Sequence, residues 1–149
     1  MNKFIKFFKK VNQDKKIVFI VEDNEVYAKS LQSFIQNRFS DMVEVKIFRI
    51  GEMCLAELHL NPSIVIMDYF LNSKYENAQN GLEIIKRIKE QIPQTNIIVL
   101  SIQEDFNVVL ESIRQYDCFY VQKNQEAFNK VEGFIKEIFN SENTSTSES

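Results

Sequence analysis

A short apolar run that ends in an acid, Ser63-Ile64-Val65-Ile66-Met67-Asp68, constrains the fold most strongly. A continuous apolar run with β-branched residues at its centre is typical of a strand that is buried on both faces, as in a parallel sheet covered by helices. Open sheets of this kind bind their ligands at the carboxyl ends of their strands. The sequence therefore predicts that Asp68 lies at a binding edge.

The rest of the chain alternates between strand and helix patterns. The predicted strands are 16–21, 43–48, 63–68, 96–100 and 118–121, and the predicted helices are 25–39, 51–60, 81–89, 105–115 and 128–139. Alternation of this kind implies a parallel sheet with right-handed crossovers and helices on both faces. We therefore expect an α/β fold with a doubly wound, five-stranded parallel sheet, in which the strictly alternating strand 43–48 lies at an edge.

We expect one folded domain, residues 16–140, flanked by an N-terminal extension and a C-terminal tail that differ in composition. Residues 1–15 are basic and amphipathic, with Phe and Val at helical spacing between lysines. We interpret them as a frayed extension that rests on the domain; contact with an anionic membrane or a partner is the less favoured alternative. Residues 141–149 contain only Ser, Glu, Asn and Thr and are predicted to be a disordered tail.

The composition excludes several classes of protein. A net charge of −3 gives no reason to expect nucleic-acid binding. No apolar run approaches the roughly 18 residues of a membrane-spanning helix, and the first residues lack the apolar core of a signal peptide. Cys54 and Cys118 have no metal-type spacing and are expected to be reduced thiols. A cytoplasmic location is the expectation.

Polar residues of complementary chemistry follow four of the predicted strands: Glu22, Asp23, Asp68, Ser101 and Lys123. Because the carboxyl ends of the strands share one edge, these side chains should converge. Three carboxylates placed together repel one another, and a hard cation that prefers oxygen ligands, such as Mg²⁺, would relieve the repulsion. A lysine and a hydroxyl beside them could hold a phosphoryl group, with Asp68 as its nucleophilic acceptor.

Other kinds of catalysis have little support. His59 is the one histidine of the chain and is expected to be a surface helix residue, which excludes Ser-His and Cys-His nucleophile systems. The chain has no Gly-rich phosphate loop. A Mg²⁺-dependent phosphatase that uses Asp68 would need a second acid just after the nucleophile, where Tyr69 and Phe70 stand.

On these residues the chain resembles the receiver domain of two-component response regulators, over about residues 16–140. The matching segments are Val21-Glu22-Asp23-Asn24, Ile66-Met67-Asp68, Gly81-Leu82-Glu83, Val99-Leu100-Ser101 and Tyr120-Val121-Gln122-Lys123. The resemblance implies a flavodoxin-like fold with strand order 2-1-3-4-5. It also implies a phosphoprotein of phosphorelay signal transduction that catalyses only its own phosphorylation and dephosphorylation, and is not otherwise an enzyme.

The resemblance assigns roles to the acidic residues. Asp68 is the implied phosphoacceptor. Asp23 and Asp68 would bind Mg²⁺ directly and Glu22 through water. The backbone carbonyl of Phe70 would be a further ligand.

The resemblance also implies a switch and a set of partners. Ser101 would move onto the phosphoryl group, Lys123 would pair with that group, and Tyr120 would rotate inward. The donor would be a histidine kinase or a histidine phosphotransfer protein. No output domain follows residue 140, so we expect a stand-alone receiver that signals to a protein target by a population shift.

The implied output face combines the helix 105–115, the strand 118–121 and the final helix, and could also form a homodimer. Its candidate contributors, some of which must belong to the core, are Phe106, Val109, Phe119 and Tyr120.

Several positions depart from the family pattern: the long loop 71–80 with Asn72 in place of Pro, Ile102 in place of a small residue, and Asn124 in place of Pro. Phe70 and Gln103 flank the site at positions that influence phosphoryl lifetime in the family. Ile102 leads to the hypothesis that small phosphodonors enter slowly. The alternative function is a receiver-like module that binds partners without phosphorylation.

Overall fold

The computed structural model describes residues 15–70, 81–102 and 106–147. Five strands, β1 (Lys16–Val21), β2 (Val43–Phe48), β3 (Ile64–Asp68), β4 (Asn96–Ser101) and β5 (Phe119–Gln122), form one parallel sheet of order β2-β1-β3-β4-β5. The helices are α2 (Glu25–Phe39), α3 (Gly51–Ala56), α4 (Gly81–Gln91), α5 (Phe106–Ile113) and α6 (Ala127–Ser147), with short 3₁₀ turns η1 (Ser40–Met42), η2 (Leu58–Leu60) and η4 (Arg114–Tyr116). The predicted flavodoxin-like α/β class and strand order are confirmed.

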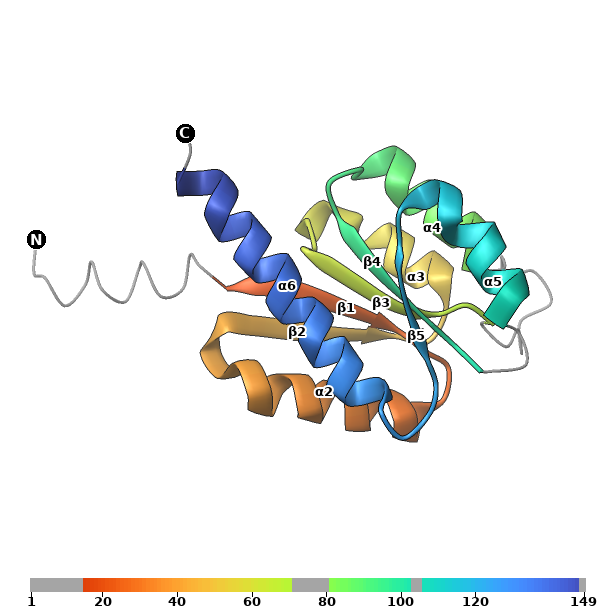
Figure 1. Ribbon diagram of the computed structural model, residues 1–149, viewed down its shortest axis with the longest axis horizontal. Coiled ribbons are helices and arrows are strands. Elements are labelled where there is room, and N and C mark those ends of the chain that lie inside the picture. The colour runs from red at the N-terminus through yellow and green to blue at the C-terminus, as the bar shows by residue number, and fades with distance from the viewer. Residues whose placement is uncertain (1–14, 71–80, 103–105, 148–149) are drawn as a thin grey trace, which may run out of the picture.

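The helices form two layers on the sheet (Figure 1). α2 and α6 cover one face, and α3, α4 and α5 cover the other. In β1, Val18 and Ile20 pack on the α2–α6 side while Phe19 and Val21 pack on the opposite side, and all four are fully buried. Successive side chains of a strand point to opposite faces, so a strand covered on both sides must be apolar throughout.

The central strand β3 brings Asp68 to the carboxyl edge of the sheet. Ile64 to Met67 are fully buried, whereas Asp68 is 8% exposed. Met67 pairs in register with Val21, and Asp68 pairs with Leu100. The ends of β1, β3 and β4 therefore lie at one level. β2 is an edge strand with a partly exposed pattern, as its alternating sequence predicts.

The predicted helix 51–60 is interrupted. α3 ends at Ala56, η2 follows, and Asn61 closes the turn in the left-handed region with φ 57°. Pro62 comes next and disfavours a helical conformation for the residue before it. His59 lies in η2 with a 68% exposed side chain, so its predicted surface position is confirmed, although not in an α-helix.

The C-terminal residues differ from the expected disordered tail, because α6 continues through Ser147. Hydroxyl groups in this polar stretch donate to carbonyls one turn back: Ser141 Oγ to Glu137 O at 3.0 Å, and Thr144 Oγ1 to Asn140 O at 2.7 Å. Such local bonds are compatible with a helix even where composition suggests a loop. Lys16 Nζ also lies 3.1 Å from a carboxylate oxygen of Glu142.

Some predictions fall outside the described residues, namely those for 1–14, for the loop 71–80 and for Gln103. None of the described helices is long and apolar enough to cross a membrane.

Candidate functional site

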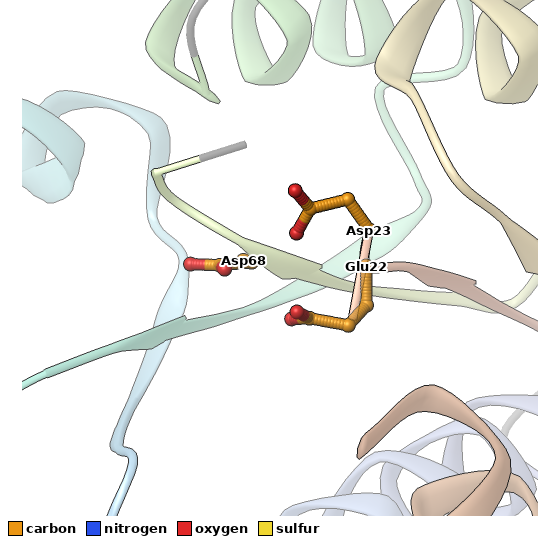
Figure 2. A group of neighbouring side chains, drawn as sticks. All are labelled: Glu22, Asp23 and Asp68. Atoms are coloured by element: carbon orange, nitrogen blue, oxygen red, sulfur yellow. The ribbon is translucent and has the colours of Figure 1, made fainter. Parts of the chain in front are cut away.

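Three carboxylates gather at the carboxyl edge of the sheet. Glu22 and Asp23 follow β1, and Asp68 ends β3; one oxygen from each lies within 4.8 Å of the others. Figure 2 shows the side chains of Glu22 and Asp23 extending from β1 toward the side on which Asp68 lies. Glu22 is only 2% exposed. The predicted convergence of the acids is therefore observed.

The first turn of α2 orders the Glu22 carboxylate. Asn24 Oδ1 accepts from the Tyr27 N–H at 3.0 Å and caps the helix, and the Asn24 N–H donates to Glu22 Oε1 at 3.2 Å. An Asn side chain at this position satisfies one of the free N–H groups of a helix start. The same residue thus begins α2 and orients an acid of the site.

Lys123 joins two of the acids. It follows β5, and its Nζ donates to Glu22 Oε2 at 2.9 Å and to Asp68 Oδ2 at 3.0 Å. Its backbone N–H donates to Ser101 O at 2.7 Å, which fixes its level beside β4. The side chain is 16% exposed, so these charge-assisted bonds are partly shielded from water.

Burial dominates the electrostatics of the cluster. It raises the pKa of Glu22 to about 7, together with the charge of Asp68, against the lowering effect of Lys123. Burial likewise raises the pKa of Asp68, with Lys123 opposing. Burial alone would lower the pKa of Lys123, but the Glu22 hydrogen bond and the charges of both acids outweigh it and raise that pKa. The single ammonium of Lys123 therefore does not fully compensate the negative charge of the clustered carboxylates.

The donor set fits a divalent cation. When all three carboxylates are ionised, they and the one ammonium sum to −3 + 1 = −2, and the carboxylates offer oxygen atoms alone. Hard cations such as Mg²⁺ prefer such ligands and retain several waters. Glu22, Asp23 and Asp68 are the residues that would hold the ion, which would supply compensating positive charge.

The chain just after Asp68 is tightly placed. The Phe70 N–H donates to Asp68 Oδ1 at 3.1 Å, and the Tyr69 N–H donates to Leu100 O at 2.9 Å. Gly81, the first residue of α4, lies against the Tyr69 backbone. Both oxygens of Asp68 are thus oriented, one by the main chain and one by Lys123. The Phe70 carbonyl is within the described chain, and its role as a metal ligand stays a prediction.

Ser101 and Tyr120 lie on the neighbouring strands β4 and β5, where Ser101 pairs with Gln122 and Tyr120 pairs with Val99. Ser101 is fully buried, and its hydroxyl donates to the Ile102 carbonyl at 3.3 Å. Tyr120 is partly buried and packs on the core beneath α3, α4 and α5. The Ile102 side chain is 48% exposed. The switch roles of Ser101 and Tyr120 stay predictions.

Asn124, which stands where the family pattern has Pro, begins the connection to α6. Its Oδ1 accepts from the Glu126 N–H at 2.9 Å, and its backbone O accepts from the Ala127 N–H at 3.1 Å. An amide side chain that bonds the main chain two residues on is a common turn device. The departure therefore has a local structural explanation.

Tyr27 is the neighbour of the site that the sequence reasoning missed. Helical periodicity places it among the inward-facing residues of 25–39, but its ring centroid lies 4.6 Å from Lys123 Nζ. The available signal is its spacing: it follows Asp23 by four residues and so lies one turn into α2. Burial raises the pKa of its phenol.

The fold is thus a flavodoxin-like α/β sandwich, and the carboxyl edge of its sheet carries clustered acids, a lysine and a buried serine. The sequence profile of the response regulator receiver domain matches residues 18–131. The chain belongs to this family and is a receiver domain of a response regulator.

Solved structures with the same fold include the receiver domain of a putative LuxO repressor protein from Vibrio parahaemolyticus, with 13% identity, a TM-score of 0.73, and 91% of this chain and 98% of that chain covered. The receiver domain of Francisella response regulator 1452 has 13% identity and a TM-score of 0.70, with 85% and 98% covered. Response regulator DrrB from Thermotoga maritima has 24% identity and a TM-score of 0.70, with 86% and 54% covered. At such identities the likeness establishes the fold alone. No curated protein sequence matches the chain significantly.

Proposed function

We propose that this receiver accepts a phosphoryl group on Asp68, with Mg²⁺ held by Glu22, Asp23 and Asp68. The observation that carries the proposal is the position of Lys123. Its ammonium lies 3.0 Å from the buried Asp68 carboxylate within the acid cluster. A nucleophilic carboxylate beside the Lys123 ammonium, with further carboxylates that could bind a divalent cation, suits phosphoryl transfer, in which positioning and charge neutralisation supply most of the catalysis.

The transfer balances with a phosphohistidine donor. A carboxylate oxygen of Asp68 forms the new O–P bond as the N–P bond breaks, and the electron pair stays on the imidazole nitrogen, which takes up a proton from solvent. The Lys123 ammonium lies where it can pair with the oxygens of the transferred group. The Ser101 hydroxyl would turn from the Ile102 carbonyl to the same oxygens, and Tyr120 would follow by rotating inward. The Phe70 carbonyl would complete the metal ligands.

The donor that we propose is a histidine kinase or a histidine phosphotransfer protein, and the output is binding to a protein target. The surface proposed for it combines α5, β5 and α6. Val109 is fully buried and so belongs to the core of this region, whereas Phe119 and Tyr120 are partly buried. The free thiols of Cys54 and Cys118 fit the reducing conditions of a cytoplasm, which is the compartment that we propose.

Intact-mass spectrometry after incubation with acetyl phosphate and Mg²⁺ tests the proposal. We expect one phosphoryl adduct per chain, absent from Asp68→Asn and from a sample in EDTA. Asp41→Asn, which alters an exposed acid in η1, is the matched control and should label like the unmodified chain. A phosphorylated histidine phosphotransfer protein serves as a second donor. Absence of an adduct with both donors would contradict the proposal.

One observation favours a second function, binding of a partner without phosphorylation. Lys123 already links Glu22 and Asp68, so this pair of acids is partly neutralised without any added cation. In that case neither donor would label the chain in the presence of Mg²⁺. The Asp68→Asn variant would bind the partner with the same affinity as the unmodified chain does.

A further inference from the structure

Lys123 has a third neighbour besides the two carboxylates, the aromatic ring of Tyr27. The ring centroid lies 4.6 Å from Lys123 Nζ, within the roughly 6 Å range of a cation–π interaction. The ammonium is therefore enclosed by two acids and by a π surface. Because the Lys123 side chain is only 16% exposed, little water competes for this contact.

The Tyr27 ring is held in place by its surroundings. Its backbone N–H is fixed by the Asn24 cap at 3.0 Å. The ring meets Phe128, in the first turn of α6, edge to face at 5.5 Å and 74°, and Phe128 also contacts Phe34 at 5.4 Å. A ring anchored at its backbone and packed against a second aromatic cannot turn freely, so its contact with the ammonium is a defined one.

The Tyr27 hydroxyl does not explain the position of the side chain. Its Oη is buried and has no hydrogen-bond partner within the described part of the chain. A buried hydroxyl without a partner is unfavourable by itself. The favourable contribution at this position must therefore come from the ring, and Tyr27→Phe separates the two.

A ring face is a suitable neighbour for a lysine whose hydrogen-bond acceptors change during phosphorylation. Hydrogen bonds to Glu22 and Asp68 are directional, whereas attraction to a ring face is spread over its area. When Asp68 carries a phosphoryl group, the ammonium must shift from carboxylate to phosphoryl oxygens. A ring beside it stabilises the cation in both positions without competing for its donor hydrogens.

We propose that Tyr27 is a positioning residue for Lys123: its ring holds the ammonium beside Asp68 and, through Phe128, couples the position of that ammonium to the first turn of α6. The proposal rests on the function proposed above and adds to it a contact between the phosphorylation site and α6. Coupling of this kind is reciprocal, so a change at Phe128 must also alter the behaviour of Lys123.

The first test is spectroscopic and needs no variant. Protons above the face of an aromatic ring are shifted upfield, so the side-chain methylene protons next to Lys123 Nζ should resonate upfield of those of exposed lysines in the NMR spectrum of the full chain. The shift should persist in Tyr27→Phe and disappear in Tyr27→Leu. Ordinary lysine shifts in the unmodified chain would overturn the proposal whatever the variants do.

The second test is kinetic. Labelling by acetyl phosphate is followed over a range of donor concentrations for the unmodified chain, Tyr27→Phe and Tyr27→Leu. Loss of the ring should lower the labelling rate at saturating donor on the order of 3- to 30-fold, the range that a partly desolvated cation–π contact corresponds to. Half-saturation should change little, and Tyr27→Phe should stay within about twofold of the unmodified chain, since it keeps the ring face.

Phe34→Leu is the matched control. Phe34 lies on the same helix and contacts the same Phe128 ring, but the cation over its ring is Arg38, at 5.0 Å, and not Lys123. It should lose a similar amount of thermal stability to Tyr27→Leu without the loss of rate. Equal labelling rates for Tyr27→Leu and the unmodified chain overturn this proposal alone, whereas an unmodified chain that takes no label overturns the proposed function.

Discussion

Gly81 lies directly against the main-chain carbonyl of Tyr69, the residue that follows Asp68. A β-carbon at Gly81 would overlap the carbonyl group and the α-carbon of Tyr69. The Tyr69 backbone cannot retreat easily, because its N–H is bonded to Leu100 O at 2.9 Å. The start of α4 and the end of the strand that carries the acceptor are thus packed backbone to backbone, which only glycine allows.

Gly81→Ala should therefore destabilise the fold. We expect a loss of about 1–3 kcal/mol in the free energy of unfolding, as for other overpacked sites. Gly133→Ala is the control, because it lies inside α6 with no atom within 4 Å of an added β-carbon. That change should be neutral or should stabilise by roughly 0.5–1 kcal/mol through helix propensity. Urea unfolding measures both, and equal stability of the two variants would contradict the packing argument.

Mg²⁺ and the charge of Asp23 should act together on stability. In EDTA, Asp23→Asn should unfold at the same temperature as the unmodified chain or higher, because one of three clustered negative charges is gone. In excess Mg²⁺ the free energy of unfolding of the unmodified chain should rise by about 2.7–4.1 kcal/mol at 100–1,000 times the dissociation constant. The variant should gain much less.

Differential scanning calorimetry with and without Mg²⁺ measures this crossed pattern. Asp41→Asn removes an exposed acid outside the cluster and should respond to Mg²⁺ like the unmodified chain. An equal gain for Asp23→Asn would exclude Asp23 as a ligand.

Ile102 should limit the entry of small phosphodonors. Its side chain follows the buried Ser101 and is 48% exposed, so it lies at the border between the site and solvent. We expect Ile102→Ala to label faster with acetyl phosphate, by roughly 2- to 10-fold, which corresponds to about 0.4–1.4 kcal/mol in the barrier. Met42→Ala, at a 57% exposed position in η1, is the control. Equal rates for Ile102→Ala and the unmodified chain would refute the steric hypothesis.

The alkylation rates of the two thiols should depend on pH differently from that of free cysteine. Burial raises the pKa of Cys54 to about 12 and that of Cys118 to about 11. Only the thiolate reacts, so alkylation of Cys118 should rise about tenfold per pH unit up to pH 10, whereas a thiol with a pKa near 8.5 levels off. Cys54 is fully buried and should stay unmodified in the folded protein. Iodoacetamide labelling with peptide mapping measures both, and a plateau for Cys118 near pH 9 would show that its pKa is not raised.

The layout of the sheet and the meeting of Asp68 with Lys123 could be predicted because both depend on simple patterns. A buried parallel strand must be apolar throughout, and the residue after it must lie at the carboxyl edge. Those two rules locate Glu22, Asp23, Asp68, Ser101 and Lys123 without knowledge of any contact. The hydrogen bonds of Asn124 and the packing of Gly81 depend on main-chain positions that no such pattern encodes.

The sequence could not predict the contact of Tyr27 with Lys123 or the C-terminal end of α6, for two different reasons. Periodicity predicts that Tyr27 faces inward, but its contact with Lys123 depends on how the first turn of α2 and the residue after β5 meet at the carboxyl edge of the sheet. In the stretch 141–147, composition favours disorder, and the hydroxyl bonds from Ser141 and Thr144 to carbonyls one turn back are compatible with helix all the same. Short-range side-chain bonds of this kind leave no periodic signal.

The length of α6 has a mechanical consequence for the contact between Tyr27 and Phe128 at its first turn. Its 21 residues span about 31 Å, and Phe128 lies in the first turn, while Phe139 is its last fully packed core residue. A rigid rod that pivots by about 5° at one end moves by roughly 3 Å at the other, given this length. Because core packing holds α6 as far as Phe139, a change of tilt beside Lys123 would produce its largest displacement beyond that residue, at the tip of α6 farthest from the acid cluster.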